Sequence, residues 1–346
     1  MPFQIIRNDI TKVRADAIVN TANPQPMIGG GTDSAIYVAA GEKELLVERK
    51  KIGKIQPGQA MPTDAFKLQA KYIIHTVGPS WIDGQHGERE ILHSCYENSL
   101  NLAAKLQCES VAFPLIATGV YQFPKDEALQ IALSEINKFL LSHEMEVILV
   151  VFDRKAFELS SKLSGSIREF IDENSVQNLG RQEYGDLLYS ASAAGPELRR
   201  EQPRRADKEM PGPVAGALPK ELEGKDLKDL VDNPGKTFRE KLFELIDQSG
   251  MDDVSVYKKA NIDRKLFSHI KTRKDYKPKK KTVIALGVAL GLDLPTMEDL
   301  LGRAGFALSP SSKADLIIMY FVSKRDYDIF EINAALFDYG QPLLGE

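Results

Sequence analysis

The sequence predicts an α/β layered sandwich with a mixed, mainly parallel sheet, joined by a flexible linker to a small all-helical domain. Short runs rich in Ile, Val and Phe alternate with helical patterns in the first half of the 346-residue chain, an order typical of layered α/β folds. This pattern dissolves from about residue 175 to 235, and helical periodicity then returns almost to the C-terminus. We therefore divide the chain into domains at 1–174 and 236–346 with a linker at 175–235.

Five segments of the first domain are expected to be buried strands. Each is short and rich in Ile, Val and Phe, as strands covered on both faces should be. They are Phe3–Arg7, Ala17–Asn20, Tyr72–Thr76, Val111–Leu115 and Val147–Phe152. Between them, residues 89–107 and 125–141 carry apolar side chains at helical spacing. Ligands of such sheets bind beyond the carboxyl ends of the strands, so the loops that directly follow strands are candidate binding loops.

The rest of the chain contains a linker and then helices. Residues 175–235 mix Pro, Gly, Ala, Arg and Glu without apolar periodicity, which is typical of a mobile linker. Helices are expected over Phe238–Gln248, Ser255–Ala260, Asp263–Lys271, Lys281–Leu290, Met297–Ala304, Lys313–Ser323 and Ile329–Phe337.

Composition excludes several classes of protein. A formal net charge of −4 does not suit a protein that coats nucleic acid along its whole surface. Cys95 and Cys108 belong to no CxxC or Cys/His cluster, so a structural zinc site or a disulfide framework is not expected. The N-terminus lacks the basic and apolar regions of a signal peptide, and no uninterrupted apolar stretch is long enough to span a membrane. We expect a cytoplasmic protein.

The loop after the strand at 17–20 is the most informative segment of the chain. It carries Asn20 and Asn23, then Gly29, Gly30 and Gly31, and then Asp33 where a helix should begin. Glycines can leave backbone N–H groups bare for an anion, and a helix N-terminus adds further free N–H groups. The loop is therefore a candidate phosphate or sugar-phosphate site. A glycine triplet also fits a plain turn, and neither usual nucleotide signature is present.

Four motifs occur in order along the first domain: Asp9-Ile10-Thr11, the asparagine–glycine loop, Ile74–Pro79 and Phe113–Tyr121. Together they resemble the macrodomain family, which binds ADP-ribose, over roughly residues 2–172. The match is nearest to the hydrolase branch, with its N-A-A-N, glycine run and V-D-G. The resemblance implies a three-layer macrodomain that hydrolyses an ADP-ribosyl ester of an acidic protein side chain, or O-acetyl-ADP-ribose, without metal or cofactor.

The resemblance also implies residues for the adenosine end of the ligand. Asp9 would accept a hydrogen bond from the adenine amino group, Ile10 would contribute its backbone, and Phe152 would place its ring against adenine. Asp9 could instead cap a turn, and Phe152 could be an ordinary core residue.

The second glycine-bearing loop resembles the S-T-G-V-Y loop of the family. The backbone N–H groups of Thr118, Gly119 and Val120 would cradle the diphosphate, and Tyr121 would form a wall of the distal ribose site. Ala117 replaces the serine of the family pattern, a loss that a loop relying on main-chain donors should tolerate.

Asn23 and Asp33 are the candidate catalytic residues. The amide of Asn23 offers a donor and an acceptor to ribose hydroxyls, and Asp33 would orient or help activate water at the distal ribose, as the resemblance implies. Asp33 could instead be the N-cap of the following helix. Thr32, Ser34 and Tyr37 depart from the family pattern around it. Asn20 is interpreted as a turn residue and His75 as a hydrogen-bonded core histidine.

Part of the second domain, residues 255–301, resembles the helix-turn-helix of lambda-type bacterial repressors. Asn261 lies where the tight turn needs a left-handed residue, and Asp263 would cap the next helix. Residues 257–281 hold eleven Lys and Arg against two acids, which suits contact with a phosphate backbone. Leu266 on the candidate recognition helix is less polar than base readout requires. A solvated lysine face on a protein-binding domain fits equally well.

Three functions compete for this chain. The first is hydrolysis of an ADP-ribosyl linkage, and the second is a reader that binds ADP-ribose or ADP-ribosylated protein without turnover. The third is a regulator that senses an ADP-ribosyl ligand and binds DNA or a protein through residues 236–346. None of them involves a membrane.

Overall fold

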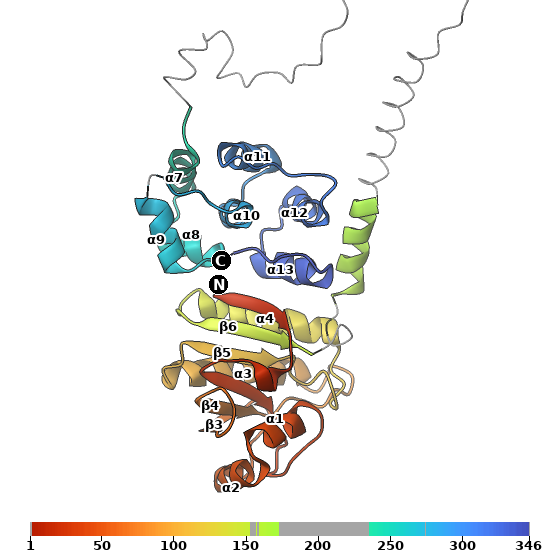
Figure 1. The fold of residues 1–346 in the computed structure, drawn as a ribbon. Coiled ribbons are helices and arrows are strands. Elements are labelled where there is room, and N and C mark those ends of the chain that lie inside the picture. The colour runs from red at the N-terminus through yellow and green to blue at the C-terminus, as the bar shows by residue number, and fades with distance from the viewer. Residues whose placement is uncertain (1, 153–156, 158, 173–234, 274, 346) are drawn as a thin grey trace, which may run out of the picture.

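The computed structural model describes residues 2–152, 157, 159–172, 235–273 and 275–345, and its N-terminal region is an α/β sandwich (Figure 1). The six-stranded sheet has the order β1-β6-β5-β2-β4-β3. All neighbouring strands pair in parallel except β3 and β4, which are antiparallel. The strands are β1 Phe3–Arg7, β2 Ala17–Thr21, β3 Ala60–Asp64, β4 Tyr72–Thr76, β5 Ser110–Pro114 and β6 Glu146–Val151. The predicted mixed, mainly parallel sheet is confirmed.

The sheet is covered by helices on both faces, so its central strands are apolar on both sides. In β2, Ala17 and Val19 face one buried cluster, which includes residues of α3 and α4, while Ile18 faces a second cluster with residues of α1 and α2. This alternation follows from the two-residue period of a strand. The helices of this region are α1 Thr32–Ala40, α2 Glu42–Ile52, α3 Glu88–Lys105 and α4 Lys125–Leu140, with a short 3-10 helix at Ile10–Lys12 and a further helix over 161–172.

One strand escapes the sequence prediction. The edge strand β3 contains Pro62 and is half exposed, and Thr63 is its only buried residue. Proline removes a backbone donor and is tolerated in sheets mainly at edges. A pattern search for apolar runs misses such a strand because its pairing with β4, rather than its own composition, holds it in place.

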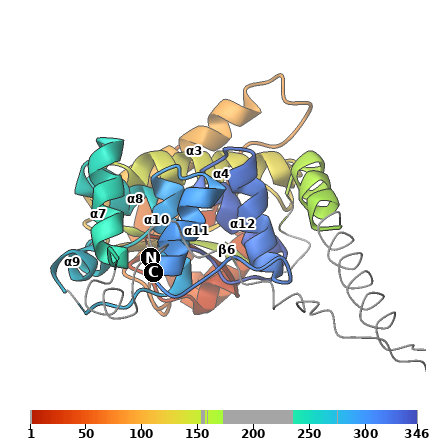
Figure 2. The ribbon, with the colours of Figure 1, turned by 90° about the horizontal axis from the view of Figure 1, so that it is seen from above.

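The C-terminal region is all-helical, as the sequence predicts. Six of its seven described helices begin at a residue whose side chain accepts a hydrogen bond from a backbone N–H of the first turn, which satisfies groups that a helix end leaves unpaired. The middle helix α10 is buried from Thr282 to Ala289. Figure 2 shows it among its neighbours. The helices are α7 Phe238–Ser249, α8 Asp253–Lys259, α9 Arg264–Thr272, α10 Lys280–Ala289, α11 Leu294–Arg303, α12 Lys313–Ser323 and α13 Ile329–Asp338.

The helical region packs directly against the edge strand β1 (Figure 1). Asn261, buried and at φ 53°, accepts a hydrogen bond from Phe3 N–H (2.9 Å) and donates one to Phe3 C=O (2.9 Å). Because β1 pairs with β6 alone, these outward-facing backbone groups would otherwise be buried without partners. The Asn261 amide thus substitutes for a neighbouring strand.

Helix α13 extends this interface along β1. The rings of Phe3 and Phe330 lie 4.8 Å apart, and those of Phe157 and Phe337 lie 4.9 Å apart. At the other end of β1, the Arg7 guanidinium lies 5.7 Å from the Phe337 ring centre. One continuous buried apolar cluster therefore joins the sheet to the helices. The predicted linker, 175–235, lies outside the described residues apart from its last residue. Within the described ranges no helix is long and apolar enough to cross a membrane.

Candidate functional site

A cleft of about 430 Å³ opens at the carboxyl ends of β2, β5 and β6, where parallel sheets bind ligands. The loop after β2 with the start of α1 forms one wall, and the loop after β5 forms the other. A Cβ atom placed on Gly30 would lie 3.8 Å from Val120 Cγ2, so the two glycine-bearing loops face each other. The lining residues are Thr21, Asn23, Gly29, Gly30, Gly31, Thr32, Asp33, Pro114, Leu115, Ala117, Thr118, Gly119, Val120, Tyr121, Lys125, Val150, Val151 and Phe152.

The glycines act in different ways. Gly31 is the N-cap of α1 at φ 65° and offers no side-chain cap to the first turn. The turn begins with Thr32 and Asp33, which line the cleft, so its N–H groups are candidate donors for an anion. A Cβ on Gly119 would meet nothing within 4 Å. Gly119 therefore leaves its side of the cleft open to close approach of a ligand.

Asp33 is buried (2% exposed) at the second position of α1, so the alternative that it is the N-cap is wrong. Its Oδ1 accepts a hydrogen bond from Asn20 Nδ2 (2.6 Å), and its Oδ2 accepts one from Gly29 N–H (2.5 Å). Burial raises the pKa of Asp33, and these two hydrogen bonds and the charge of Arg49 counteract that rise. The carboxylate thus ties α1 to the glycine loop at the bottom of the cleft.

A chain of buried polar groups continues from Asp33 into the sheet. Asn20 Nδ2 also lies 3.1 Å from His75 Nδ1, and His75 Nε2 lies 3.0 Å from Thr63 Oγ1. Burial lowers the pKa of His75 to about 3, so the imidazole is neutral and its Nδ1 accepts from Asn20. The prediction of a hydrogen-bonded core histidine is confirmed. Asn20, however, is a buried residue of β2 and not a turn residue, and its Nδ2 donates to Asp33 and to His75 inside the sheet.

Arg49 of α2 holds the loop that carries Asn23. Its guanidinium donates to the backbone carbonyls of Asn23 (3.0 Å), Pro24 (3.3 Å) and Gly53. Asn23 lines the cleft, and its side-chain Oδ1 accepts from Gln25 N–H (3.0 Å). Sequence analysis missed Arg49. Its one signal is the spacing of four residues from Leu45, which places both side chains on the buried face of α2.

The loop after β5 is held from behind by the segment after β4. Trp81 N–H donates to Tyr121 C=O (2.9 Å), and the Trp81 ring packs against Phe123 at 4.7 Å. Ala117 adopts φ 64° and accepts from Phe123 N–H (3.1 Å). Tyr121 and Asp33 both line the cleft, and burial and the charge of Asp33 raise the pKa of Tyr121.

Of the three residues expected at the adenosine end, the structure places Phe152 in the cleft and the other two outside its lining. Phe152 lines the cleft and is 72% exposed, which excludes a core role. Asp9 caps the 3-10 helix by accepting from Thr11 N–H (3.0 Å) and Thr11 Oγ1 (2.7 Å), and neither Asp9 nor the buried Ile10 is among the described residues that line the cleft. They lie beside it, because Asn8 N–H donates to Val151 C=O (3.1 Å).

Lys125 is a lining residue that sequence analysis also missed. It is the first residue of α4 and places a cation at the cleft, which favours an anionic ligand. Among the described residues, one group could bring metal ligands together: Asp83, His86 and Glu88. The Glu88 carboxylate already accepts from the N–H groups of residues 82, 83, 84 and 86. This group therefore organises the loop around Glu88.

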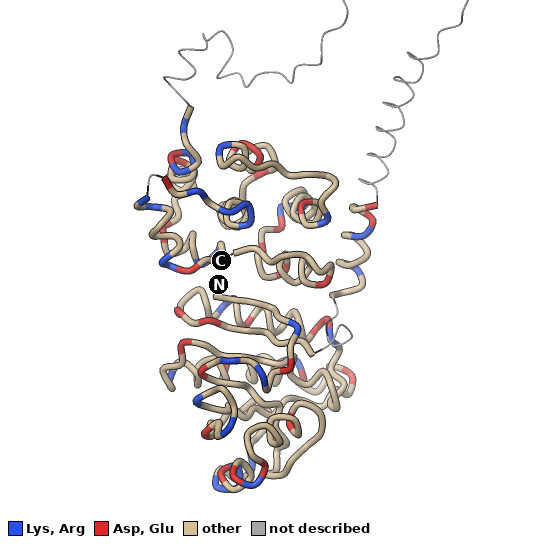
Figure 3. Tube along the Cα trace, viewed as in Figure 1, with Lys and Arg blue, Asp and Glu red and all other residues tan. Residues whose placement is uncertain are grey.

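Helices α8 and α9 occupy the positions expected for a helix-turn-helix, with Asn261 in the turn and Asp263 as the N-cap of α9. Positions of Lys and Arg, drawn blue in Figure 3, recur along this segment. Lys258 was expected to belong to an exposed basic face, but its side chain is only 10% exposed. It donates to the carbonyls of Leu141 (3.2 Å) and His143 (3.4 Å). Leu266 is partly buried against the apolar cluster. Arg264 and Lys265 of α9 remain exposed.

Residues 19–132 match the family model described as Macro domain. A Macro domain-containing protein of Mesorhizobium japonicum is 46% identical over 169 residues, which cover 48% of this chain and 96% of that protein. An O-acetyl-ADP-ribose deacetylase of Citrobacter rodentium is 44% identical over 166 residues, 46% of this chain and 94% of that protein. A solved structure of the Oceanobacillus iheyensis macrodomain with ADP is 38% identical, covers 44% of this chain and 85% of that one, and has a TM-score of 0.43. Through its N-terminal region of about 170 residues, this chain belongs to the Macro domain family.

Proposed function

We propose that the cleft binds ADP-ribose and hydrolyses an ester at its distal ribose, either an acidic side-chain linkage or O-acetyl-ADP-ribose. The observation that carries this proposal is the meeting of the two glycine-bearing loops over the buried Asp33 carboxylate. Backbone N–H groups of both loops and Lys125 suit a diphosphate. The exposed Phe152 ring suits adenine at the far side of the same cleft.

Asn23, Tyr121 and Asp33 have separate roles in the proposed reaction. The Asn23 amide binds hydroxyls of the distal ribose, and Tyr121 limits how that ribose lies. Asp33 orients a water molecule toward the ester and accepts its proton, with a share of that duty falling to the diphosphate of the substrate. The elements of water are divided between the two products, ADP-ribose and a free carboxylic acid. No metal is required for these steps.

The relative named O-acetyl-ADP-ribose deacetylase supports the enzymatic reading. The rival reading, a reader that binds ADP-ribose without turnover, uses the same cleft. We favour hydrolysis because a buried carboxylate whose pKa is raised is suited to accept a proton. We further propose the domain limits 1–174 and 236–346, with residues 175–235 as the connection.

Binding is tested by titrating ADP-ribose into the full chain in a calorimeter. We expect saturable heat with one site, and an affinity about 5-fold weaker for Asn23→Ala, since one hydrogen bond contributes on the order of 1 kcal/mol. Asn101→Ala removes an exposed asparagine outside the cleft and should leave the affinity unchanged. Absence of heat at millimolar ADP-ribose would rule out the assignment of the cleft.

A second candidate function concerns α8 and α9, which we propose form a helix-turn-helix that contacts a phosphate backbone. The supporting observation is that Arg264 and Lys265 stay exposed on α9, although Lys258 donates to carbonyls of the segment between α4 and β6. Contact with a protein partner through the same face is the alternative.

The full chain should therefore bind duplex DNA weakly, without sequence preference and with steep salt dependence. Each phosphate neutralised contributes a slope of about −0.9 to log K against log salt. A gel-shift titration of Arg264→Glu and Lys265→Glu should show weakened binding, and Lys324→Glu, an exposed reversal between α12 and α13, serves as the control. Equal DNA affinity in all three variants would favour the protein partner.

A further inference from the structure

We infer that the buried guanidinium of Arg49 is a positioning residue of the cleft, which fixes the backbone that carries Asn23 and supplies the positive charge that balances Asp33. The inference deepens the proposed hydrolysis and rests on it. Arg49 does not line the cleft, so it acts through the two residues that do.

Arg49 fixes the backbone at Asn23 through hydrogen bonds. The Arg49 side chain is 1% exposed, and one guanidinium binds three carbonyls, those of Asn23, Pro24 and Gly53. Ile55 N–H also donates to the carbonyl of Pro24 (3.0 Å). A planar guanidinium holds several acceptors in fixed directions, which a lysine ammonium cannot reproduce. The backbone at Asn23 is therefore fixed from behind before any ligand arrives.

The charge of Arg49 also bears on the ionisation of Asp33. A buried charge is costly unless an opposite charge or hydrogen bonds compensate it. The carbonyl oxygens compensate Arg49 only in part, and no ion pair joins it to a carboxylate within the described part of the chain. Arg49 binds the carbonyl of Asn23, which lines the cleft together with Asp33. Burial lowers the pKa of the guanidinium, and Tyr37 and the charge of the buried Asp33 carboxylate oppose that lowering. Each of the two groups thus favours the charged form of the other.

Three further titratable groups near Asp33, Tyr37, Tyr121 and His75, are neutral near pH 7. Burial and the charge of Asp33 raise the pKa of Tyr37 to about 12, and the same causes raise the pKa of Tyr121. His75, reached through Asn20, has its pKa lowered to about 3. Arg49 consequently supplies the positive charge that favours ionised Asp33, in addition to the hydrogen bonds from Asn20 and Gly29. Without its charge the pKa of Asp33 should rise further, and the ionised form should appear only at higher pH.

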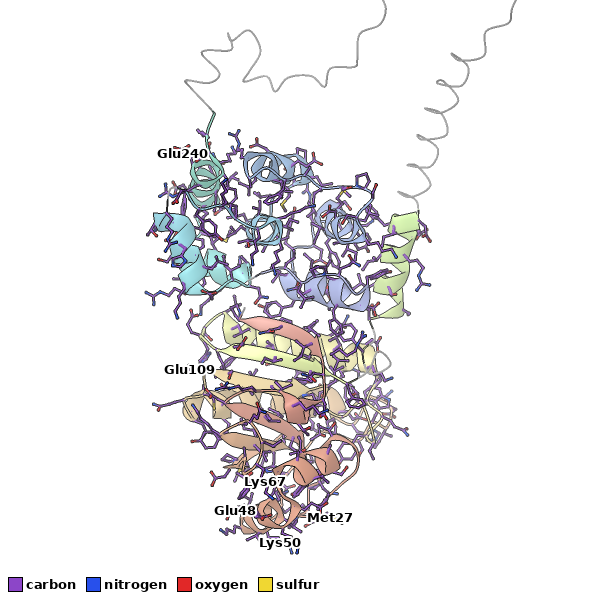
Figure 4. The ribbon with its side chains drawn as sticks, in the orientation of Figure 1. Met27, Glu48, Lys50, Lys67, Glu109 and Glu240 are labelled. Carbon is purple, nitrogen blue, oxygen red and sulfur yellow. The ribbon has the colours of Figure 1, made fainter. Side chains whose placement is uncertain are left out.

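Two substitutions separate the two roles. Arg49→Lys keeps the charge but loses the fixed set of hydrogen bonds, while Arg49→Gln keeps an amide donor but loses the charge. We expect both to lower kcat, by as much as about 10²-fold where Asn23 is displaced by 1 Å. Only Arg49→Gln should move the acid limb of the kcat–pH profile, and it should move toward higher pH. Lys50→Met removes a neighbouring exposed cation of α2, which Figure 4 shows at the end of the molecule, and should change neither quantity.

The kcat–pH profiles of the two Arg49 variants distinguish a positioning role of Arg49 from a merely structural one. If both Arg49 variants lost kcat with an unmoved acid limb, or if both matched the unaltered chain, the inference would be overturned. If Arg49→Gln did not fold, Arg49→Lys would still decide, because unchanged kcat in that variant contradicts the role of the hydrogen bonds. If the unaltered chain bound ADP-ribose without turnover, the proposed hydrolysis would fail on its own. The affinity of Arg49→Lys for ADP-ribose would then test Arg49, with a loss of about 10-fold supporting it and an unchanged affinity opposing it.

Discussion

Replacing Asp33 with alanine is expected to lower turnover of O-acetyl-ADP-ribose by roughly 10²–10⁴-fold, the range for loss of a positioned general acid–base group. The affinity for ADP-ribose should fall as well, because Asp33 Oδ2 holds Gly29 N–H in the glycine loop. Steady-state kinetics should therefore show the large loss in kcat and a smaller change in KM. A kcat equal to that of the unaltered chain would assign the chemistry to another residue.

The choice of control matters for this experiment. Asp33→Asn is not a neutral substitution, because its amide nitrogen would face either Asn20 Nδ2 or Gly29 N–H, both of which are donors. Asp126 occupies the same second position of the helix α4 and does not line the cleft. Asp126→Ala should therefore leave kcat unchanged while making the same chemical change as Asp33→Ala.

Replacing Asn261 with alanine is expected to destabilise the whole chain. The substitution leaves the N–H and C=O of Phe3 buried without partners, and each lost partner costs about 1–3 kcal/mol. Alanine at φ 53° adds about 1–2 kcal/mol of backbone strain. Denaturant unfolding of the full chain, followed by circular dichroism and by tryptophan fluorescence, measures this loss.

Asn261→Gly separates the two causes, because glycine adopts positive φ without steric cost. It should retain most of the destabilisation, since the two hydrogen bonds to Phe3 are lost in this variant too. A chain carrying Asn261→Gly as stable as the unaltered one would show that the amide does not hold the helices against β1. Arg325→Ala, at an exposed position with φ 56°, should have a small effect, because arginine and alanine both carry a Cβ at positive φ, and it is the control for shortening a side chain at such a position.

Local patterns were sufficient to predict most of the architecture. The apolar runs at β1 and β4 coincide with the observed strands, and helix α12 begins and ends where its periodicity does. These elements are visible in sequence because their own side chains form the core. Strand β3 is not, because its place depends on pairing with β4. The turn at Asn261 and the cap at Asp263 were likewise predictable, since both are properties of a few neighbouring residues.

Contacts between distant segments could not be predicted in this way. Asn261 lies 258 positions from Phe3, and Lys258 meets carbonyls more than a hundred positions away, so neither partner is implied by local pattern. Arg49 escaped notice because its acceptors are backbone carbonyls, which every sequence contains. In the cleft, the glycine loops and Asn23 were identified from their motifs. The network of Asn20, His75 and Thr63 behind Asp33 required the register of β2, β4 and β3.

Turnover by the unaltered full chain tests the central claim most directly. The chain is incubated with O-acetyl-ADP-ribose and, separately, with a protein carrying mono-ADP-ribose on acidic side chains, and the products are followed by mass spectrometry without added metal. We predict release of ADP-ribose from at least one substrate, at a rate proportional to enzyme and abolished in Asp33→Ala. Saturable binding of ADP-ribose with no product from either substrate would contradict hydrolysis and identify the cleft as that of a reader.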